Sequence, residues 1–150
     1  TLNKFKINII INVTQELDNY FEDQFEYYKF ELLDEKDNNI SNYFEDCLNI
    51  YQNNLNKNIL IHCFMGASRS ASIVIYYILN KYGDKKDKII KQIGMKENFN
   101  DNDNKKDNLT INEVIEFIKN KRGVINPTEK LILDINLKMD INYLKNNREI

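Results

Sequence analysis

The sequence has few cysteines and histidines, and it has no long apolar run. Two cysteines in 150 residues cannot build a disulfide framework, and free thiols suit a reducing compartment, so we expect a cytoplasmic or nuclear location. A single histidine, with no carboxylate cluster at ligand spacing, gives no basis for a metal site or another cofactor. No apolar run approaches the ~20 residues that span a bilayer, so a membrane helix is not expected.

The chain also lacks an excess of either charge. Lysine and arginine number 21 against 23 aspartates and glutamates, which gives a net charge of −2. This balance offers no overall basic surface for nucleic acid or an anionic membrane, and we expect neither as a partner. With 42% hydrophobic and 29% charged residues, the 150-residue chain is predicted to form one globular domain, residues 1–150. The composition does not indicate an oligomeric state.

Up to residue 83 the chain alternates between strand and helix patterns. The β-branched run Ile7–Val13 is typical of a buried strand, and Glu26–Leu33 predicts a second. Between Ser41 and Leu55 apolar residues recur at spacings of three and four, which indicates an amphipathic helix. A third strand, residues 58–62, precedes a helix that ends near Gly83. This order predicts an α/β fold with a short central sheet flanked by helices.

A polar insertion, residues 83–108, interrupts the pattern. It contains an asparagine-, aspartate- and lysine-rich tract of low complexity, which is not expected to pack. Beyond it, Thr110 and Glu113 have the spacing of a capping box, and Pro127 marks the start of a last helix. Two apolar rows run along that helix, Leu131–Ile135–Met139–Tyr143 and Leu133–Leu137–Ile141–Leu144.

The most informative stretch is residues 58–76. A strand delivers Cys63 to a tight loop, and a helix begins within that loop, near Arg69. Backbone N–H groups that point into such a loop, at the positive end of a helix dipole, form an anion site. The same field, with a nearby cation, stabilises a thiolate, the nucleophilic form of cysteine. The guanidinium of Arg69 suits two phosphate oxygens, so we interpret the stretch as a cysteine-dependent phosphatase loop.

Each residue of this loop has an expected role. The backbone amides of the loop and the Arg69 side chain would hold the phosphate oxygens, and Gly66 would let the backbone close tightly around the anion. Ser70 could donate a hydrogen bond to the sulfur when it leaves phosphorus. His62, beside the nucleophile on the strand, is better placed to support the Cys63 backbone than to transfer a proton. The residues expected to line the phosphate site are Phe64, Met65, Gly66, Ala67, Ser68 and Arg69.

The general acid must come from outside the loop, because the loop contains no carboxylate. The acidic segment 34–37 is the natural source, with Asp34, Glu35 and Asp37 as candidates. Asp34 directly follows the second predicted strand, at the sheet edge where α/β sites gather. It could protonate the leaving oxygen and then deprotonate water.

Residues 62–70 read His-Cys-Phe-Met-Gly-Ala-Ser-Arg-Ser, which resembles the dual-specificity protein phosphatase signature His-Cys-x-x-Gly-x-Ser-Arg-Ser. The similarity extends over most of residues 5–145, apart from the insertion. It implies a protein-tyrosine-phosphatase-like fold and assigns the acid to Asp34. After Pro127 the chain departs from the family pattern, with Thr128 and Lys130-Leu131 where Asn and Gly-Phe are usual.

The leading interpretation is therefore a protein phosphatase that hydrolyses phosphotyrosine and phosphoserine/phosphothreonine through a phosphocysteine, without a metal. Its partners would be phosphorylated proteins. A first alternative is a phosphoinositide or RNA 5′-phosphate phosphatase with the same loop; such enzymes often carry lysines there, and residues 64–68 contain none. A second alternative is a phosphoprotein-binding module with little turnover, which usually lacks the nucleophile or the arginine.

Overall fold

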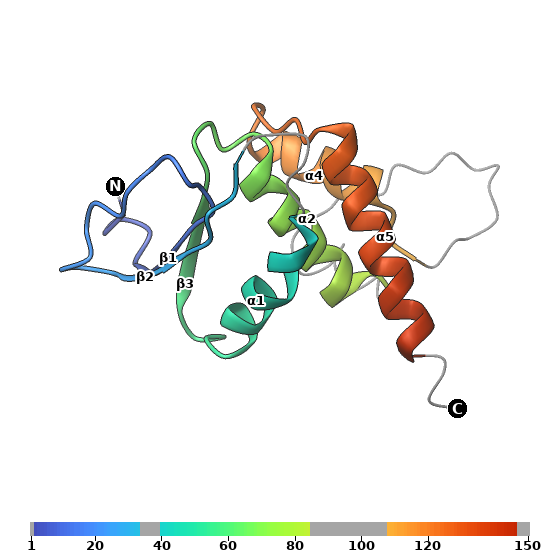
Figure 1. The fold of residues 1–150 in the computed structure, drawn as a ribbon, viewed down its shortest axis with the longest axis horizontal. Helices are drawn as coiled ribbons and strands as arrows, with labels where there is room; N and C mark the ends of the chain where they lie inside the picture. The colour runs from blue at the N-terminus through green and yellow to red at the C-terminus, as the bar shows by residue number, and fades with distance from the viewer. Residues whose placement is uncertain (1, 34–39, 85–107, 147–150) are drawn as a thin grey trace.

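The computed structural model describes residues 2–33, 40–84 and 108–146, with side chains described as far as Met139. A three-stranded parallel sheet lies on one side of the described helices (Figure 1). The prediction of an α/β fold with a short sheet is confirmed. Nearly all of the predicted insertion, 85–107, lies outside the described residues. The described elements are β1 (Ile7–Asn12), β2 (Glu26–Lys29), α1 (Ser41–Gln52), β3 (Asn58–His62), α2 (Arg69–Tyr82), α4 (Ile111–Lys121) and α5 (Glu129–Asn146).

The sheet has the order β2-β1-β3, so β1 is its central strand. In the register of the two ladders, Asn12 at the end of β1 aligns with Lys29 and with His62. All three strands are parallel, and their carboxyl ends therefore meet at one edge. The loop after β1 and the loop after β3 leave the sheet side by side at that edge, where ligand sites of α/β proteins are usually found.

Two predicted elements extend three or more residues beyond the observed ones. The second strand ends at Lys29 rather than Leu33, because a tight turn, in which Leu32 N–H donates to the Phe30 carbonyl at 2.9 Å, breaks the ladder. The first helix ends at Gln52, where the Asn54 side-chain amide donates to the Ile50 carbonyl at 2.8 Å and caps the last turn. Leu55, which the helical pattern included, is 66% exposed.

Helix α2 lies at the centre of the molecule and contacts α1, α4, α5 and β3 (Figure 1). Its buried Tyr76 stacks on Phe44 of α1 with ring centroids 4.5 Å apart, and its hydroxyl donates to Glu45 at 3.0 Å. Ile9, Ile11 and Val13, which alternate along β1 and its extension, belong to the same core. Packing on all sides fixes α2, and its first turn lies at the carboxyl edge of the sheet.

The carboxy-terminal helices pack on α2 as their sequences indicate. The predicted capping box is confirmed: Glu113 N–H donates to the Thr110 hydroxyl, and Thr110 N–H donates to the Glu113 carboxylate at 2.8 Å. Of the two apolar rows on α5, the first packs inward through its described side chains, Leu131, Ile135 and Met139, with Ile135 fully buried. In the second row, Leu133 and Leu137 are 66% and 62% exposed.

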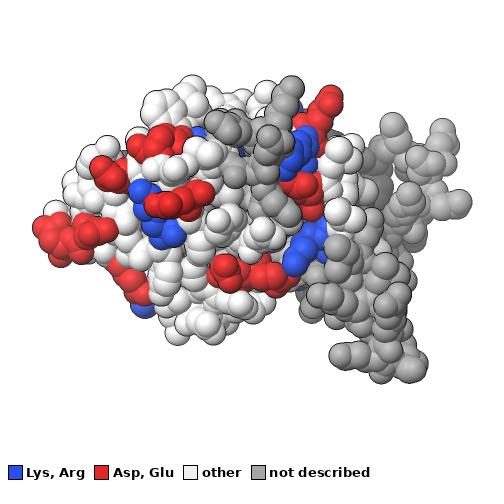
Figure 2. All heavy atoms as spheres, in the orientation of Figure 1, with Lys and Arg blue, Asp and Glu red and all other residues white. Residues whose placement is uncertain are grey.

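Acidic and basic side chains lie beside one another on the face shown in Figure 2, in keeping with the near-neutral net charge. Within the described ranges, no helix has the length and apolarity needed to cross a membrane.

Candidate active site

Cys63 is the first residue after β3, and it is 6% exposed. The next five residues form the loop expected from the sequence, and α2 begins at Arg69. Ser68 is the N-cap of this helix, and its hydroxyl is buried without a hydrogen-bond partner among the described residues. The thiol therefore lies at the base of a loop that ends at a helix N-terminus, as the anion-site interpretation requires.

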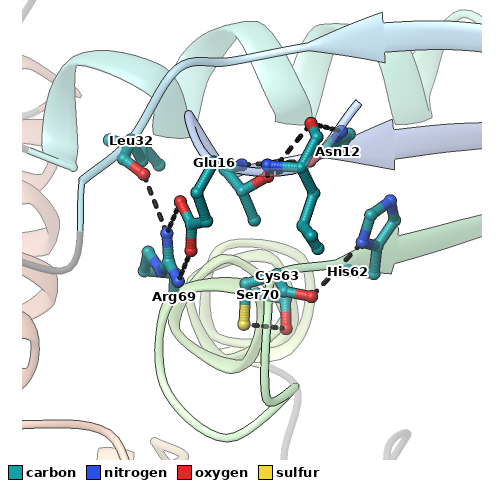
Figure 3. Close-up of polar contacts among 9 residues, drawn as sticks. Asn12, Glu16, Leu32, His62, Cys63, Arg69 and Ser70 are labelled. Atoms are coloured by element: carbon teal, nitrogen blue, oxygen red, sulfur yellow. Dashed lines mark hydrogen bonds and ion pairs between the residues drawn. The ribbon is translucent and has the colours of Figure 1, made fainter. Parts of the chain in front are cut away.

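The surroundings of Cys63 favour the thiolate form of its side chain. Burial by itself would raise the pKa of this thiol, but hydrogen bonding outweighs burial and holds the pKa below its usual value. The Ser70 hydroxyl lies 3.3 Å from Sγ (Figure 3). The backbone N–H groups of Ser70, Gly66 and Ser68 also stabilise the thiolate. Cys47 provides the contrast, because it is also a buried thiol but has no such hydrogen-bond donors among the causes of its pKa shift. Burial raises the pKa of Cys47 to about 12.

The loop is braced from outside by the segment between α4 and α5. The Asn126 N–H donates to the Ala67 carbonyl at 2.9 Å. Gly66 has a φ of +68°, and a Cβ at this position would lie 2.6 Å from Nη2 of Arg122. The left-handed backbone therefore favours a glycine here, and the Arg122 side chain would have to move aside for any other residue. Phe64 and Met65 point outward and are 62% and 70% exposed.

Arg69 is 4% exposed, and its charge is paired with a residue that sequence reasoning missed. Glu16, in the loop after β1, accepts from Nη1 at 3.0 Å and from Nη2 at 2.6 Å. The Leu32 carbonyl accepts a further hydrogen bond from Nη1 at 2.9 Å (Figure 3). The sequence did contain a signal for this residue. Glu16 follows β1 and Cys63 follows β3, and in a parallel sheet both strands end at the same edge.

The Arg69 guanidinium hydrogen-bonds the Glu16 carboxylate and lowers its pKa to about 2. Glu16 therefore carries no proton to donate near neutral pH, and it is not a candidate general acid. Asp34, Glu35 and Asp37, the three carboxylates considered for that role, lie outside the described residues.

His62, the last residue of β3, has Nδ1 3.3 Å from the carbonyl oxygen of Cys63, with which a protonated Nδ1 can form a hydrogen bond (Figure 3). This geometry suits the predicted supporting role. Across the described part of the chain, no three His, Cys, Asp or Glu side chains come together as a metal site would require. The described residues thus bring together a stabilised thiol, inward amides and a guanidinium, which can bind an anion and attack its central atom.

Residues 1–106 match the family model described as "Dual specificity phosphatase, catalytic domain". The chain is 39% identical over 83 residues to a protein phosphatase Slingshot homolog of Xenopus laevis, covering 54% of this chain and 12% of that protein. It is 25% identical over 133 residues to dual specificity protein phosphatase 1 of Arabidopsis thaliana, covering 87% of this chain and 54% of that protein. The chain therefore spans only part of each of these relatives.

Solved structures show the same fold. The crystal structure of DUSP15 aligns with a TM-score of 0.67 at 26% identity, covering 89% of this chain and 70% of that chain. The human tyrosine phosphatase-like serine/threonine/tyrosine-interacting protein aligns with a TM-score of 0.72 at 20% identity, covering 95% of this chain and 82% of that chain. At this lower identity the second likeness concerns the fold alone.

Proposed function

The chain belongs to the dual specificity phosphatase family, and from that premise we propose that it is a protein phosphatase acting on phosphotyrosine and phosphoserine/phosphothreonine. The observation that carries the proposal is the environment of Cys63, whose pKa is lowered by the Ser70 hydroxyl and the loop amides despite burial. A buried thiol without such donors, as Cys47 shows, has its pKa raised instead.

In the first step, the Cys63 thiolate attacks phosphorus, and the bond from phosphorus to the ester oxygen breaks. The loop amides of residues 64–69 and the Arg69 guanidinium hold the three non-bridging oxygens, so catalysis depends on position and electrostatics. The leaving oxygen takes a proton from the general acid. The product of this step is a phosphocysteine and the free alcohol or phenol.

We assign the general acid to Asp34 on the family resemblance, with Glu35 and Asp37 as the alternatives in the same segment. Asp34→Asn is expected to lower turnover and to remove the basic limb of the pH–rate profile, because that limb reports deprotonation of the acid. A normal profile in this variant would move the role to Asp37 or Glu35.

In the second step, water attacks the phosphocysteine, its proton passes to the Asp34 carboxylate, and the phosphorus–sulfur bond breaks. The sulfur leaves as a thiolate, which the Ser70 hydroxyl at 3.3 Å stabilises by hydrogen bonding. Inorganic phosphate is released, and the enzyme returns to its starting state. The Cys63 thiolate and then water supply the attacking electron pairs, and Asp34 gives and then takes the proton, so neither step is routed through a metal.

Phosphorylated proteins are the proposed substrates. Residues 64–68 contain no lysine that could meet additional phosphates, which disfavours phosphoinositides and RNA 5′-phosphates. The exposed side chains of Phe64 and Met65 instead offer apolar surface to a polypeptide. A binding module without turnover is disfavoured because Cys63 and Arg69 are both present.

Two free cysteines suit a reducing location, so the cytoplasm or nucleus is the proposed location.

The experiment is a comparison of turnover on phosphotyrosine and phosphothreonine peptides, a phosphoinositide and a 5′-phosphorylated RNA, with a metal chelator present throughout. Activity on both peptides that exceeds activity on the other two substrates supports the proposal. Cys63→Ser is the matched control, since it should bind the phosphopeptides and release no phosphate. Undiminished turnover in that variant would refute the nucleophile, and preference for the phosphoinositide or the RNA would establish the alternative class.

A further inference from the structure

We propose that Glu16 is a positioning residue for phosphate binding, which acts by fixing the orientation of the Arg69 guanidinium. The proposal rests on the proposed function, since it concerns the same loop. It assigns a role in the reaction to the segment between β1 and β2, which lies outside the 62–70 motif.

These contacts fix the orientation of the Arg69 guanidinium plane, in addition to placing a negative charge beside it. Glu16 makes two roughly parallel hydrogen bonds to the Nη1–Nη2 edge, at 3.0 Å and 2.6 Å, and the Leu32 carbonyl holds Nη1 from another segment at 2.9 Å. A guanidinium has a second hydrogen-bonding edge, formed by Nε and Nη2. Fixing the first edge therefore fixes the direction in which the second edge points.

The loop that carries Glu16 is itself held by buried polar side chains. Asn12 and Thr14 are both fully buried. The Thr14 hydroxyl donates to Asn12 Oδ1 at 2.7 Å, and it accepts from the Leu17 N–H at 3.1 Å. The Asn12 side-chain amide donates to the Leu17 carbonyl at 2.9 Å. These bonds close the turn on both sides of Glu16, so its carboxylate is in place before a phosphate arrives.

The burial of Arg69 favours the pair. Arg69 is 4% exposed, and an unpaired cation at such a site would be strongly unfavourable. The Glu16 pKa of about 2 keeps the carboxylate ionised over the working pH range, so the contact does not open as pH changes. We therefore expect the effect of Glu16 on anion binding to be the same at all pH values at which the enzyme is active.

The test compares the alkylation of Cys63 by iodoacetate, an anion, with its alkylation by neutral iodoacetamide, measured by site-resolved mass spectrometry. Both reagents need the thiolate, so the ratio of the two rates isolates anion binding at the loop. Glu16→Gln should lower this ratio about tenfold, the change that corresponds to one charge-assisted hydrogen-bonded contact. The KM for an aryl phosphate should rise in parallel.

Asp18→Asn is the matched control. It removes the same charge from the same loop, but the Asp18 side chain is 92% exposed and lies 3.9 Å from Lys29. This variant should keep the wild-type ratio. Thr14→Val serves as the second variant, because it leaves the Glu16 charge and loosens the turn; it should lower the ratio in the same direction, by less.

A wild-type ratio in a folded Glu16→Gln protein would overturn the proposal, and if that variant does not fold, a wild-type ratio in Thr14→Val would do the same. Failure of the proposed function has a different signature. In that case the wild-type protein would release no phosphate from either phosphopeptide, whatever the effect of Glu16→Gln on the alkylation ratio.

Discussion

Removing the Ser70 hydroxyl tests how the loop activates its thiol. This hydroxyl lies 3.3 Å from Cys63 Sγ and is first among the contacts that lower the thiol pKa. Cysteine attacks as the thiolate, so kcat/KM falls as pH drops through the thiol pKa. Ser70→Ala destabilises the thiolate and raises its pKa. The acidic limb of the pH profile should therefore move to higher pH.

The same change should slow the second chemical step more than the first. A hydrogen bond to a charged group contributes about 1.5–3 kcal/mol, and each 1.36 kcal/mol is tenfold in rate, so release of the thiolate should slow by about ten- to a hundredfold. Rapid mixing with an aryl phosphate should then show a burst of phenol followed by slow turnover, with phosphocysteine accumulating on Cys63.

Ser72→Ala is the control for this experiment. Its hydroxyl is also buried on the first turns of α2, but it donates to the Ser68 carbonyl at 2.8 Å rather than to the sulfur. In the Ser72→Ala variant we expect the acidic limb of the kcat/KM profile to stay at the wild-type pH. An unmoved limb and no burst in Ser70→Ala would refute the argument that this hydroxyl stabilises the thiolate.

Two further predictions concern the loop and the fold. Gly66→Ala should lower kcat/KM for an aryl phosphate about tenfold, because a φ of +68° costs a residue with a Cβ about 1–2 kcal/mol and Arg122 must also move. Gly123→Ala is the control, since a Cβ at Gly123 would meet open space. Equal activity of the two variants would contradict the prediction. Thr110→Ala removes the capping box of α4 and should cost about 1 kcal/mol, a fall in Tm of about 2–4 °C by calorimetry without loss of activity. An unchanged Tm would show that the cap contributes no stability.

The sequence predicts the cysteine loop well because its parts are contiguous. A strand, the thiol, the loop glycine, Arg69 and the helix occupy one stretch, so local pattern suffices to place them. Glu16 was missed because its contact with Arg69 joins residues 53 apart. That pairing depends on the parallel register of β1 and β3, which strand patterns do not specify.

The last helix shows a second limit of the same kind. Its two apolar rows have similar composition, and the period of the sequence does not distinguish them. Tertiary packing decides which row is buried, because only one face of α5 can contact α2. That face carries Ile135, while Leu133 and Leu137 are exposed. Likewise, the strand pattern through Leu33 could not reveal the turn at Phe30–Leu32, which brings the Leu32 carbonyl to Arg69.

The pairing of Arg69 with Glu16 also changes how the thiolate is explained. The sequence suggested that a nearby cation would help to lower the Cys63 pKa, yet the guanidinium is held by a carboxylate and the loop supplies its own donors to the sulfur. Thiolate formation and anion binding should then be separable. In the Ser70→Ala/Glu16→Gln double variant, the acidic limb should match that of Ser70→Ala, and the iodoacetate-to-iodoacetamide ratio should match that of Glu16→Gln. The two effects should add within about 0.5 kcal/mol. A larger coupling would mean that the Arg69 charge sustains the thiolate as well as holding the phosphate.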